Sequence, residues 1–596
     1  MARKLLDSKT LVEGYLRDKD WRVKENSNSP KSFGGLNKYL AGEVSKNYWL
    51  NEVYTSEIRN AYLKGDLHIH DLSGLTLYCC GFSLENILLM GVQGISNIPT
   101  SSPAKHFGSA LNQMANLITV YQNEIMGAVA LNNVDTLLAP FIAYDKLSRE
   151  QVKQELQNFI YSINSNSRGG AEPAFTNVTF DITPSDDMLN KPIIHGGKYE
   201  PKTYKMFQKE QDMFNEVFTE IMLAGDSLGK PFAYPIITYN IGKRFDWDNP
   251  KNDNMFKMAG KFGYPYFANF INSDMDESDI RSMCCRFRID LRELRKRNGG
   301  LFGSGDNTGS IGVVTINLPR IGYVADDEAE LFELLDKQLV IAKKSLELKR
   351  AFLQEAILEG GLIPAYQKYV GTLDNHFSTI GVVGMNEMCE NFLDADIQSV
   401  QGKDLSLRVG EYILKRLADF QEETGNIYNY EATPAESTAY RLAQKDVETF
   451  DGIITRGTKE VPYYTNSCHI PVANISTIKD TYDHQDALQE QFTGGTVIHN
   501  YLNGAISGNQ AKHILKTILT NYKAPYTSLS PLNRYCPEHG YVAEQVDTCP
   551  QCGAELELYQ RITGYLRKVE NFNDGKKAEF KDRKQLKGEI LGEDKI

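Results

Sequence analysis

The chain has 596 residues, of which 41% are hydrophobic and 24% are charged. A chain of this length can form several domains or one large barrel with additions. Its formal net charge of -12 at pH 7 argues against a protein that coats nucleic acid. The sequence has no apolar run long enough to span a bilayer and no signal-peptide pattern at its start. Nine cysteines in a chain of this length indicate a reducing compartment, so we expect a cytoplasmic protein.

The first motif follows a polar segment, residues 1–30, that we expect to be a mobile N-terminal extension. The run Gly65-Asp66-Leu67-His68-Ile69-His70-Asp71 alternates two histidines on one face of a predicted strand. Two histidines and an aspartate can hold a metal ion, but no further ligand is in view. We therefore favour a buried, hydrogen-bonded turn.

An adjacent cysteine pair comes next, in the run Tyr78-Cys79-Cys80-Gly81. Free cysteines are often small buried hydrophobic residues, so the pair alone does not establish chemistry. Residues 121–141 combine small residues with a polar stripe, and they predict one helix.

Two strands are predicted from alternating patterns. Residues 175–181 follow a glycine turn, and their polar Asn177 can face a ligand; residues 229–240 form a second turn and strand. Strands that alternate with helices are typical of an α/β barrel or an open α/β sheet, and the pattern does not choose between them. No G-x-G-x-x-G follows an early strand, which argues against a Rossmann fold.

A second cysteine pair, Cys284 and Cys285, precedes Arg286 and a stretch of glycine-rich loops that lacks the P-loop pattern. Residues 326–359 then predict the clearest helix. Asp326 can cap its start, leucines form its apolar stripe, and the two glycines at 360–361 end it.

The run from Asn429 to Thr438 reads NYEATPAEST, in which Pro434 fits the end of a strand and the start of a helix. The free N–H groups of such a helix start can hold an anion. Glu436 is explained equally well as a carboxylate that the helix dipole favours.

The residues near the C-terminus contain a C-x2-H…C-x2-C set: Cys536, His539, Cys549 and Cys552. Four ligands without an open position suit a closed, structural zinc site. A chance cluster of thiols and an extracellular disulfide set are the alternatives, and the latter is disfavoured because nothing else looks secreted.

The run Arg561-Ile562-Thr563-Gly564-Tyr565 follows at once, with a glycine inside a strand-like pattern. By itself Gly564 indicates only a close approach of the backbone. Together, the zinc set and this R-[IV]-x-G-Y run resemble the anaerobic (class III) ribonucleotide reductases, which are glycyl radical enzymes. Further motifs resemble the family in the family's order, from about Ser32 to Leu566.

The resemblance implies a fold: a ten-stranded α/β barrel of the glycyl radical enzyme and ribonucleotide reductase type, with a central finger loop and a small zinc-binding glycyl radical domain. We expect residues 1–30 to be an extension without an ATP-cone, 31–525 to be the barrel, and 526–596 to be the C-terminal domain with a flexible tail.

The resemblance also implies an activity, the reduction of ribonucleotides, expected to be triphosphates, to 2′-deoxyribonucleotides. Gly564 would store a radical, and Cys285 would carry a transient thiyl that takes the 3′-hydrogen of the substrate. Cys79, or alternatively Cys80, and Glu431 would assist the loss of water and the reduction. The expected substrate-binding residues are Asn177, Thr433, Ala435, Glu436, Ser437 and Thr438.

The expected partners follow from the same resemblance. A radical-SAM iron–sulfur activating enzyme would install the radical, because the chain has no C-x3-C-x2-C of its own. Cys284 beside the thiyl position favours a thioredoxin- or glutaredoxin-like dithiol as the reductant, with formate as the alternative. We also expect nucleotide effectors, a homodimer and a zinc ion that takes no part in the chemistry.

Two other interpretations remain open at this point. Another glycyl radical enzyme, such as an acyl lyase or a dehydratase, would share the cysteine and glycine logic, although it would need no external reductant. A zinc-ribbon scaffold without enzyme activity is the second. It predicts that changing Cys285 or Gly564 to alanine has no effect on function.

Overall fold

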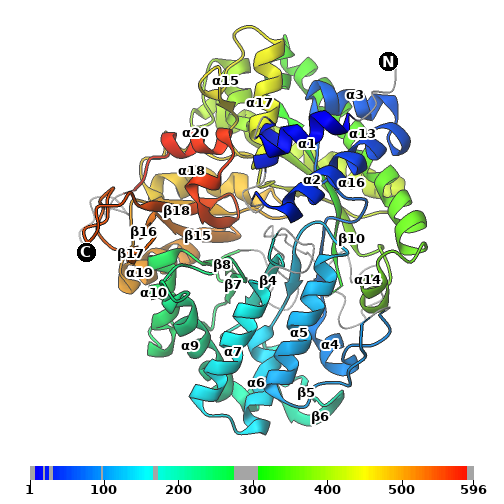
Figure 1. The fold of residues 1–596 in the computed structure, drawn as a ribbon. Coiled ribbons are helices and arrows are strands. Elements are labelled where there is room, and N and C mark those ends of the chain that lie inside the picture. Colours follow the sequence, from blue (N-terminus) through cyan, green and yellow to red (C-terminus); the bar gives the residue numbers. More distant parts are fainter. Residues whose placement is uncertain are drawn as a thin grey trace.

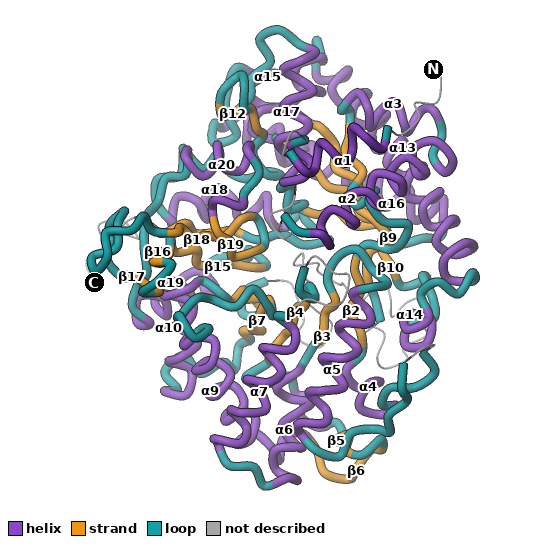
Figure 2. Tube along the Cα trace, viewed as in Figure 1, coloured by secondary structure: helices purple, strands orange, loops and turns teal. Residues whose placement is uncertain are grey.

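The computed structural model describes residues 7–17, 20–25, 31–95, 98–165, 172–273 and 307–586. Cys284 and Cys285, the predicted redox pair, therefore lie outside the described residues. Helices surround strands that run through the centre of the molecule (Figures 1 and 2).

One large mixed sheet organises the chain. Its strands are β1 (Leu67–Ile69), β2 (Cys79–Phe82), β3 (Val129–Leu131), β4 (Thr176–Phe180), β7 (Ile236–Ile241), β8 (Pro265–Asn269), β9 (Gly309–Asn317), β10 (His376–Val383), β11 (Tyr428–Glu431), β14 (Ile498–Leu502) and β15 (Tyr526–Pro531). Smaller sheets contain β5 (Pro192–His195), β6 (Lys198–Thr203), β12 (Arg456–Gly457), β13 (Pro462–Tyr463), β16 (Asn533–Cys536), β17 (Gly540–Val542), β18 (Glu557–Ile562) and β19 (Tyr565–Lys568).

The strand order is β11-β10-β9-β2-β3-β4-β7-β8-β15-β14, and β1 pairs with β9 outside this path. Pairing is parallel within β2-β3-β4-β7-β8, within β9-β10-β11 and within β14-β15, and antiparallel where β2 meets β9 and β8 meets β15. The segment that leads into β14 bonds to the end of β11, where Ala432 N–H donates to the Gly495 carbonyl at 2.9 Å. The ten-strand path therefore returns on itself, in agreement with the predicted α/β barrel.

Helices cover the outside of this sheet. The buried apolar residues of α5, α6, α7 and α9 pack on the β2-to-β8 half, and those of α13, α15 and α16 pack on β9, β10 and β11 in the same continuous core. The helices are α1 (Ser8–Leu16), α2 (Phe33–Tyr48), α3 (Ser56–Lys64), α4 (Leu84–Met90), α5 (Phe107–Gln122), α6 (Val134–Asp145), α7 (Arg149–Ile163), α8 (Asp186–Asn190), α9 (Gln208–Ala224), α10 (Asp253–Phe262), α12 (Leu318–Val324), α13 (Glu328–Phe352), α14 (Pro364–Tyr369), α15 (Met385–Leu393), α16 (Val400–Thr424), α17 (Ser437–Thr449), α18 (Ile478–Glu490), α19 (Gly508–Asn521) and α20 (Asp574–Asp582).

The prediction of a single helix over residues 121–141 is wrong. The segment contains the end of α5, the strand β3 and the start of α6. β3 lies between β2 and β4 and is buried on both faces, so its apolar run has no period-2 alternation that would distinguish it from a helix. The helix predicted over 326–359 is present as α13, although its N-cap is Asp327 rather than Asp326.

The C-terminal region forms a small separate sheet of order β17-β16-β18-β19. The predicted domain boundary at residue 526 precedes β15, which pairs with β14 and β8 in the large sheet. The small sheet therefore begins at Asn533. Gly564 lies between β18 and β19, in the turn that connects them.

The described part of the tail is folded, contrary to the prediction of a flexible tail. After β19 the chain forms α20, which packs against α17 and β13 (Figure 1). Lys576 and Glu579 of this helix and its C-cap residue Arg583 are buried, and Glu579 pairs with both cations. A charged segment can be buried because mutual pairing offsets the cost of removing the charges from water.

The N-terminal segment is also folded where it is described. Asp7 caps α1, and the hydroxyl of Tyr15 donates to the Ser32 carbonyl at 3.0 Å. Trp21 packs edge-on against Tyr440 of α17, with ring centroids 5.5 Å apart. The prediction that residues 1–30 are mobile is therefore wrong for these parts. Among the described helices, none is both long and apolar enough to cross a membrane.

Candidate functional site

The four predicted zinc ligands come together at one point. All their ligand atoms lie within 4.8 Å of one another. The Cys536 sulfur is 3.5 Å from Nδ1 of His539 and 3.6 Å from the sulfur of Cys552, and the Cys549 sulfur is 3.7 Å from the same His539 nitrogen. The glycines after each ligand pair, Gly540 and Gly553, adopt the left-handed backbone that such tight turns need.

These separations fit a tetrahedral zinc ion. Zinc–sulfur bonds of about 2.3 Å put the sulfur atoms at two corners of a tetrahedron about 3.8 Å apart, which is close to the spacing found. Cys536 and Cys549 are buried beside Val542 and Leu556 in a small apolar cluster of their own. Three sulfurs and one imidazole complete the coordination, so the arrangement suits a structural ion that holds the small sheet together.

The first cysteine pair lies on β2, and alternation along this strand sends its two side chains to opposite faces of the sheet. Cys79 packs on the inner face with Ala128, Ala130 and Phe377. Cys80 packs in the outer helical core, and burial raises the pKa of its thiol well above the usual value. The inner position of Cys79 supports its assignment over the alternative Cys80.

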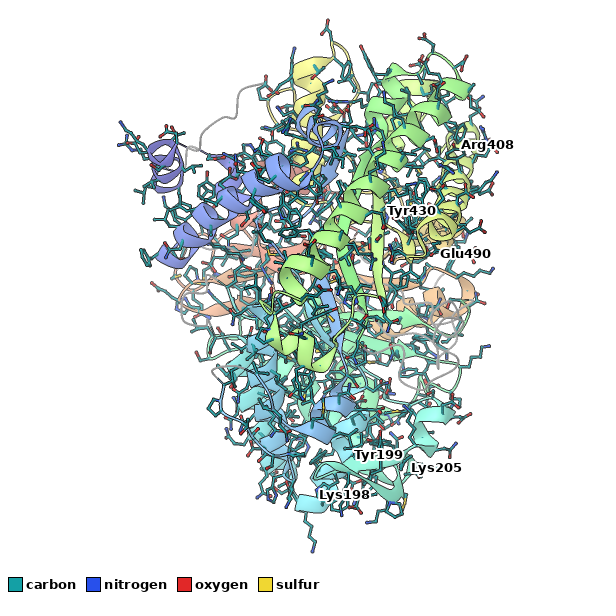
Figure 3. The ribbon with its side chains drawn as sticks, turned by 90° about the vertical axis from the view of Figure 1, so that its right-hand side faces the viewer. Lys198, Tyr199, Lys205, Arg408, Tyr430 and Glu490 are labelled. Carbon is teal, nitrogen blue, oxygen red and sulfur yellow. The ribbon has the colours of Figure 1, made fainter. Side chains whose placement is uncertain are left out.

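The same alternation puts other predicted residues on the inner face. On β4, Val178 and Phe180 belong to the outer core, so Asn177 faces inward; on β11, Tyr428 and Tyr430 are outward and Glu431 is inward. Figure 3 shows Tyr430 within the molecule, and its ring stacks on Phe492 at 4.3 Å. Asn177 and Glu431 are each 1% exposed.

Several buried polar atoms near this inner face have no hydrogen-bond partner within the described part of the chain. They are the amide nitrogen of Asn177, both amide atoms of Asn429 and the hydroxyl of Thr563. Buried polar groups in proteins are almost always satisfied, so this set is typical of a site that binds a polar ligand. Asn429 was not predicted as a site residue, although its spacing two residues before Glu431 places both on one face of a strand.

The segment predicted to hold an anion, from Thr433 to Thr438 and called the anion cradle below, has the expected local structure. β11 ends at Glu431, Pro434 follows, and α17 begins at Ser437. Glu436 occupies the N-cap position without making a side-chain cap, so it leaves the first N–H groups of the helix to another acceptor. These groups and the helix dipole favour a bound phosphate.

A cavity of about 280 Å³ connects this cradle with two of the other predicted motifs. Glu436, Ser437 and Thr438 line one side, Tyr78 lies beside Cys79, and Thr563 and Tyr565 flank Gly564. Residues far apart in the sequence therefore meet around one space.

Two predicted substrate contacts lie elsewhere. Thr433 lines a neighbouring cavity, and its hydroxyl accepts a hydrogen bond from Thr315 at 3.3 Å. Ala435 is buried with Val383 and Ala439 in an apolar cluster. The side chain of Ala435 therefore offers no contact to a ligand in the cradle cavity.

Basic residues from the N-terminal segment line the same cavity and were not predicted. Arg22 pairs with Asp20 and Glu43, and Lys38 pairs with Glu172 at 2.9 Å. Arg22 and Lys38 are isolated basic residues outside any recognisable motif, so the sequence did not indicate that they line this cavity. Because both cations are paired with carboxylates, their charges are offset locally and add no net positive potential to the cavity.

Gly564 is held at the tip of the β18–β19 hairpin against the barrel. Thr563 has a φ of 42°, which allows the tight turn, and Tyr565 packs edge-on against Phe175 at 5.1 Å. The Gly564 carbonyl accepts hydrogen bonds from Tyr266 at 2.7 Å and from Arg561 at 3.1 Å. The predicted contact of Gly564 with Cys285 remains a prediction, because residue 285 is outside the described residues.

The histidines of the first motif do not form a metal cluster. Within the described residues, the group at Cys536–Cys552 is the one set of three or more candidate ligands. Burial lowers the pKa of His68 well below its usual value and that of His70 to about 3, so both rings are neutral at pH 7. His70 bonds to the hydroxyl of Thr315 at 2.8 Å, as expected for a buried, hydrogen-bonded turn.

Comparison with known proteins adds independent information. A family model described as anaerobic ribonucleoside-triphosphate reductase matches residues 25–586. The anaerobic ribonucleoside-triphosphate reductase of Haemophilus influenzae is 24% identical over 642 aligned residues, which cover 96% of this chain and 85% of that protein. The one from Enterobacteria phage T4 is 23% identical over 605 residues, covering 95% and 93%.

Solved structures share the fold. An anaerobic ribonucleotide reductase matches with a TM-score of 0.77 at 21% identity, covering 97% of this chain and 94% of that chain. The Thermotoga maritima anaerobic ribonucleotide reductase in complex with dATP and CTP matches with a TM-score of 0.74 at 21% identity, covering 96% and 99%. From the extent of the family match, this chain belongs to the anaerobic, class III, ribonucleoside-triphosphate reductase family.

Proposed function

We propose that this chain reduces ribonucleoside triphosphates to 2′-deoxyribonucleotides by glycyl and thiyl radical chemistry. The observation that carries the proposal is the cavity that joins the N-terminus of α17, Tyr78 beside Cys79, and the residues on either side of Gly564. An anion cradle, a thiol and a radical store are the three parts that this reaction requires.

The substrate's phosphates bind at the first turn of α17. Ser437 and Thr438 contribute hydroxyls there, and the free N–H groups and the dipole of the helix favour the negative charge. The ribose then lies toward the inner face of the sheet, where Asn177 and Asn429 have polar atoms available for hydrogen bonding. Because the side chain of Ala435 is buried in an apolar cluster, only its backbone can take part.

The chemistry uses the residues on the inner face. Gly564 takes a hydrogen atom from the thiol of Cys285, and the resulting thiyl removes the 3′-hydrogen of the ribose. Glu431 assists loss of the 2′-hydroxyl as water, and Cys79 supplies hydrogen to the 2′-carbon. The 3′-hydrogen is returned at the end, so the net change is one ribonucleotide and one dithiol converted to one deoxyribonucleotide, one disulfide and water.

The partners follow from this cycle. A radical-SAM activating enzyme removes the first hydrogen atom from Gly564. A thioredoxin- or glutaredoxin-like dithiol restores the cysteines, with Cys284 relaying the disulfide by exchange; formate is the alternative reductant. The zinc ion at Cys536, His539, Cys549 and Cys552 holds the hairpin domain, and nucleotide effectors act on a homodimer.

A lyase or dehydratase of the same fold is disfavoured. The solved Clostridioides difficile hydroxyproline dehydratase matches with a TM-score of 0.57 at 11% identity, covering 96% of this chain and 88% of that chain. This is weaker than the match to the reductases. The family model and the relatives that we compared are reductases as well.

Electron paramagnetic resonance tests the proposal. The full chain is incubated without oxygen with a radical-SAM activating enzyme, S-adenosylmethionine and a reductant, beside a Gly564→Ala variant. A doublet that requires Gly564 is the expected result. A verified active activating enzyme that produces no doublet would refute the radical store and favour a scaffold.

A second step identifies the reductant. The radical-loaded chain receives a ribonucleoside triphosphate together with either formate or a reduced dithiol protein, and deoxyribonucleotide is quantified. Product with the dithiol protein alone is expected. Product with formate alone, unchanged in a Cys284→Ser variant, would assign the reduction to formate.

A further inference from the structure

The backbone carbonyl of Gly564 accepts hydrogen bonds from two buried side chains that belong to different parts of the fold. The hydroxyl of Tyr266, on β8 of the barrel, donates to it at 2.7 Å. The guanidinium of Arg561, on β18 of the hairpin, donates to it at 3.1 Å and also donates to the Tyr266 oxygen. The three groups form a closed triangle of hydrogen bonds.

Arg561 is a buried cation, and within the described part of the chain no carboxylate forms an ion pair with it. Its other acceptors are the neutral carbonyl oxygens of Gly263 and Tyr264, and its guanidinium carbon lies 4.1 Å from the centre of the Tyr266 ring. The side chain is 3% exposed. Burial lowers the pKa of Arg561 to about 9, which leaves it charged at neutral pH.

A buried charge that is balanced only by neutral oxygens destabilises a fold relative to a paired one. Its position therefore calls for an explanation other than stability. One of the Arg561 nitrogens, Nη1, donates to the Gly564 oxygen and to the Tyr266 oxygen, so part of the buried positive charge lies at the Gly564 carbonyl.

We propose that Tyr266 and Arg561 are positioning residues that stabilise the Gly564 radical through its carbonyl oxygen. The inference rests on the proposed function of Gly564 as the radical store. An unpaired electron on the glycine α-carbon is shared with the adjoining carbonyl. Two donors, one of them charged, draw electron density toward that oxygen and so favour the shared, planar form.

The consequence concerns one hydrogen-atom exchange. When Gly564 takes a hydrogen atom from the Cys285 thiol, a Cα–H bond forms at Gly564 and an S–H bond breaks, with no net oxidation. Tyr266 and Arg561, together called the clamp below, stabilise the glycyl radical. They therefore shift the exchange toward the state in which the radical is on Gly564 and not on Cys285. Because Tyr266 belongs to the barrel and Arg561 to the hairpin, the clamp also ties the radical residue to the barrel wall.

The test compares three variants by radical content. Tyr266→Phe removes one donor and keeps the ring, and Arg561→Lys keeps the charge but loses the forked geometry. Tyr239→Phe is the matched control, since Tyr239 is buried on the adjacent strand β7 and its hydroxyl has no partner in the described part of the chain. Zinc content and melting temperature verify that each variant is folded.

After activation, we expect Tyr266→Phe to hold about two- to tenfold less radical, or to lose it that much faster, than wild type, as the net worth of one hydrogen bond implies. Glycine labelled with ¹³C at the carbonyl gives a direct signature: the carbonyl hyperfine coupling should change in Tyr266→Phe and Arg561→Lys but not in Tyr239→Phe. A purely structural role would leave this coupling unchanged.

The outcomes separate this inference from the function on which it rests. A doublet with the same yield, decay and carbonyl coupling in wild type and in both clamp variants overturns the clamp and leaves the radical store intact. No doublet in wild type, with an active activating enzyme, overturns the proposed function and the clamp with it. If Tyr266→Phe does not fold, Arg561→Lys decides between the first two results.

Discussion

The buried ion triad of α20 offers a quantitative prediction. Glu579 forms ion pairs with Lys576 and with Arg583, and the Arg583 Nη2 atom lies 2.8 Å from the Glu579 carboxylate. The three residues are at most 6% exposed. Arg583 also donates to the backbone carbonyl of Arg561 at 3.0 Å, which links α20 to the hairpin that carries Gly564. We predict that Glu579→Gln loosens α20 because it leaves two buried cations facing a neutral amide.

The pKa of Glu579 gives the magnitude. Burial alone would raise this pKa, but the charges of Lys576 and Arg583 and their hydrogen bonds lower it from 4.5 to about 2. At about 1.4 kcal/mol per pKa unit, the pairing exceeds the cost of burial by about 3 kcal/mol. Loss of one member of a buried pair costs a similar ~3–5 kcal/mol. Because the folded pKa is depressed, this stability is present above about pH 4.5 and is lost as the pH falls toward 2.

Hydrogen exchange measured by mass spectrometry is the appropriate assay, because a chain of this size is not expected to unfold in one step. The protection of the α20 peptide should fall about 100-fold in Glu579→Gln at pH 7. The matched control is Glu570→Gln, since Glu570 pairs with Lys568 but its side chain is 72% exposed. Equal protection of α20 in wild type and Glu579→Gln would refute the assigned energy, and an unprotected α20 in wild type would refute the folded tail.

Three further predictions concern the site. Cys549→Ser should lower the zinc content from one ion per chain to nearly none by elemental analysis, and retention of a full equivalent would contradict the assigned ligands. Cys79→Ser should abolish deoxyribonucleotide formation while the radical doublet persists, whereas Cys80→Ser should keep activity; the opposite result would exchange their roles. Asn429→Ala should raise the KM for the ribonucleotide about tenfold with unchanged radical yield, since a buried polar contact is lost; an unchanged KM would exclude Asn429 from the binding site.

Local spacing was sufficient where a feature is made by neighbouring residues. The two zinc-ligand pairs each lie within one tight turn, so the sequence predicted a cluster that the structure brings within 4.8 Å. The strand–proline–helix start at Pro434 was equally local. In both cases the backbone has few alternatives once the turn residues are in place.

Charge and apolar runs were misleading where packing decides the outcome. The charged tail suggested mobility, yet Glu579 of α20 lies in the interior between Lys576 and the C-cap residue Arg583 and pairs with both. The apolar run of β3 suggested a helix, because a strand buried on both faces loses its period-2 pattern. The hydrophobic and charge pattern of a segment reflects which of its faces are buried. For β3 and α20, the burial is decided by segments from other parts of the chain.

The sequence by itself determined the cysteine and histidine set that could hold zinc, the alternation of strands and helices, and the motifs that identify the family. Only the tertiary structure decided that Cys79 rather than Cys80 faces the inner side of the sheet, since that depends on which neighbours flank β2. It also decided that Tyr266 meets Gly564, a contact between residues about 300 positions apart. Such contacts have no local signature, because they form only when the barrel has brought both segments together.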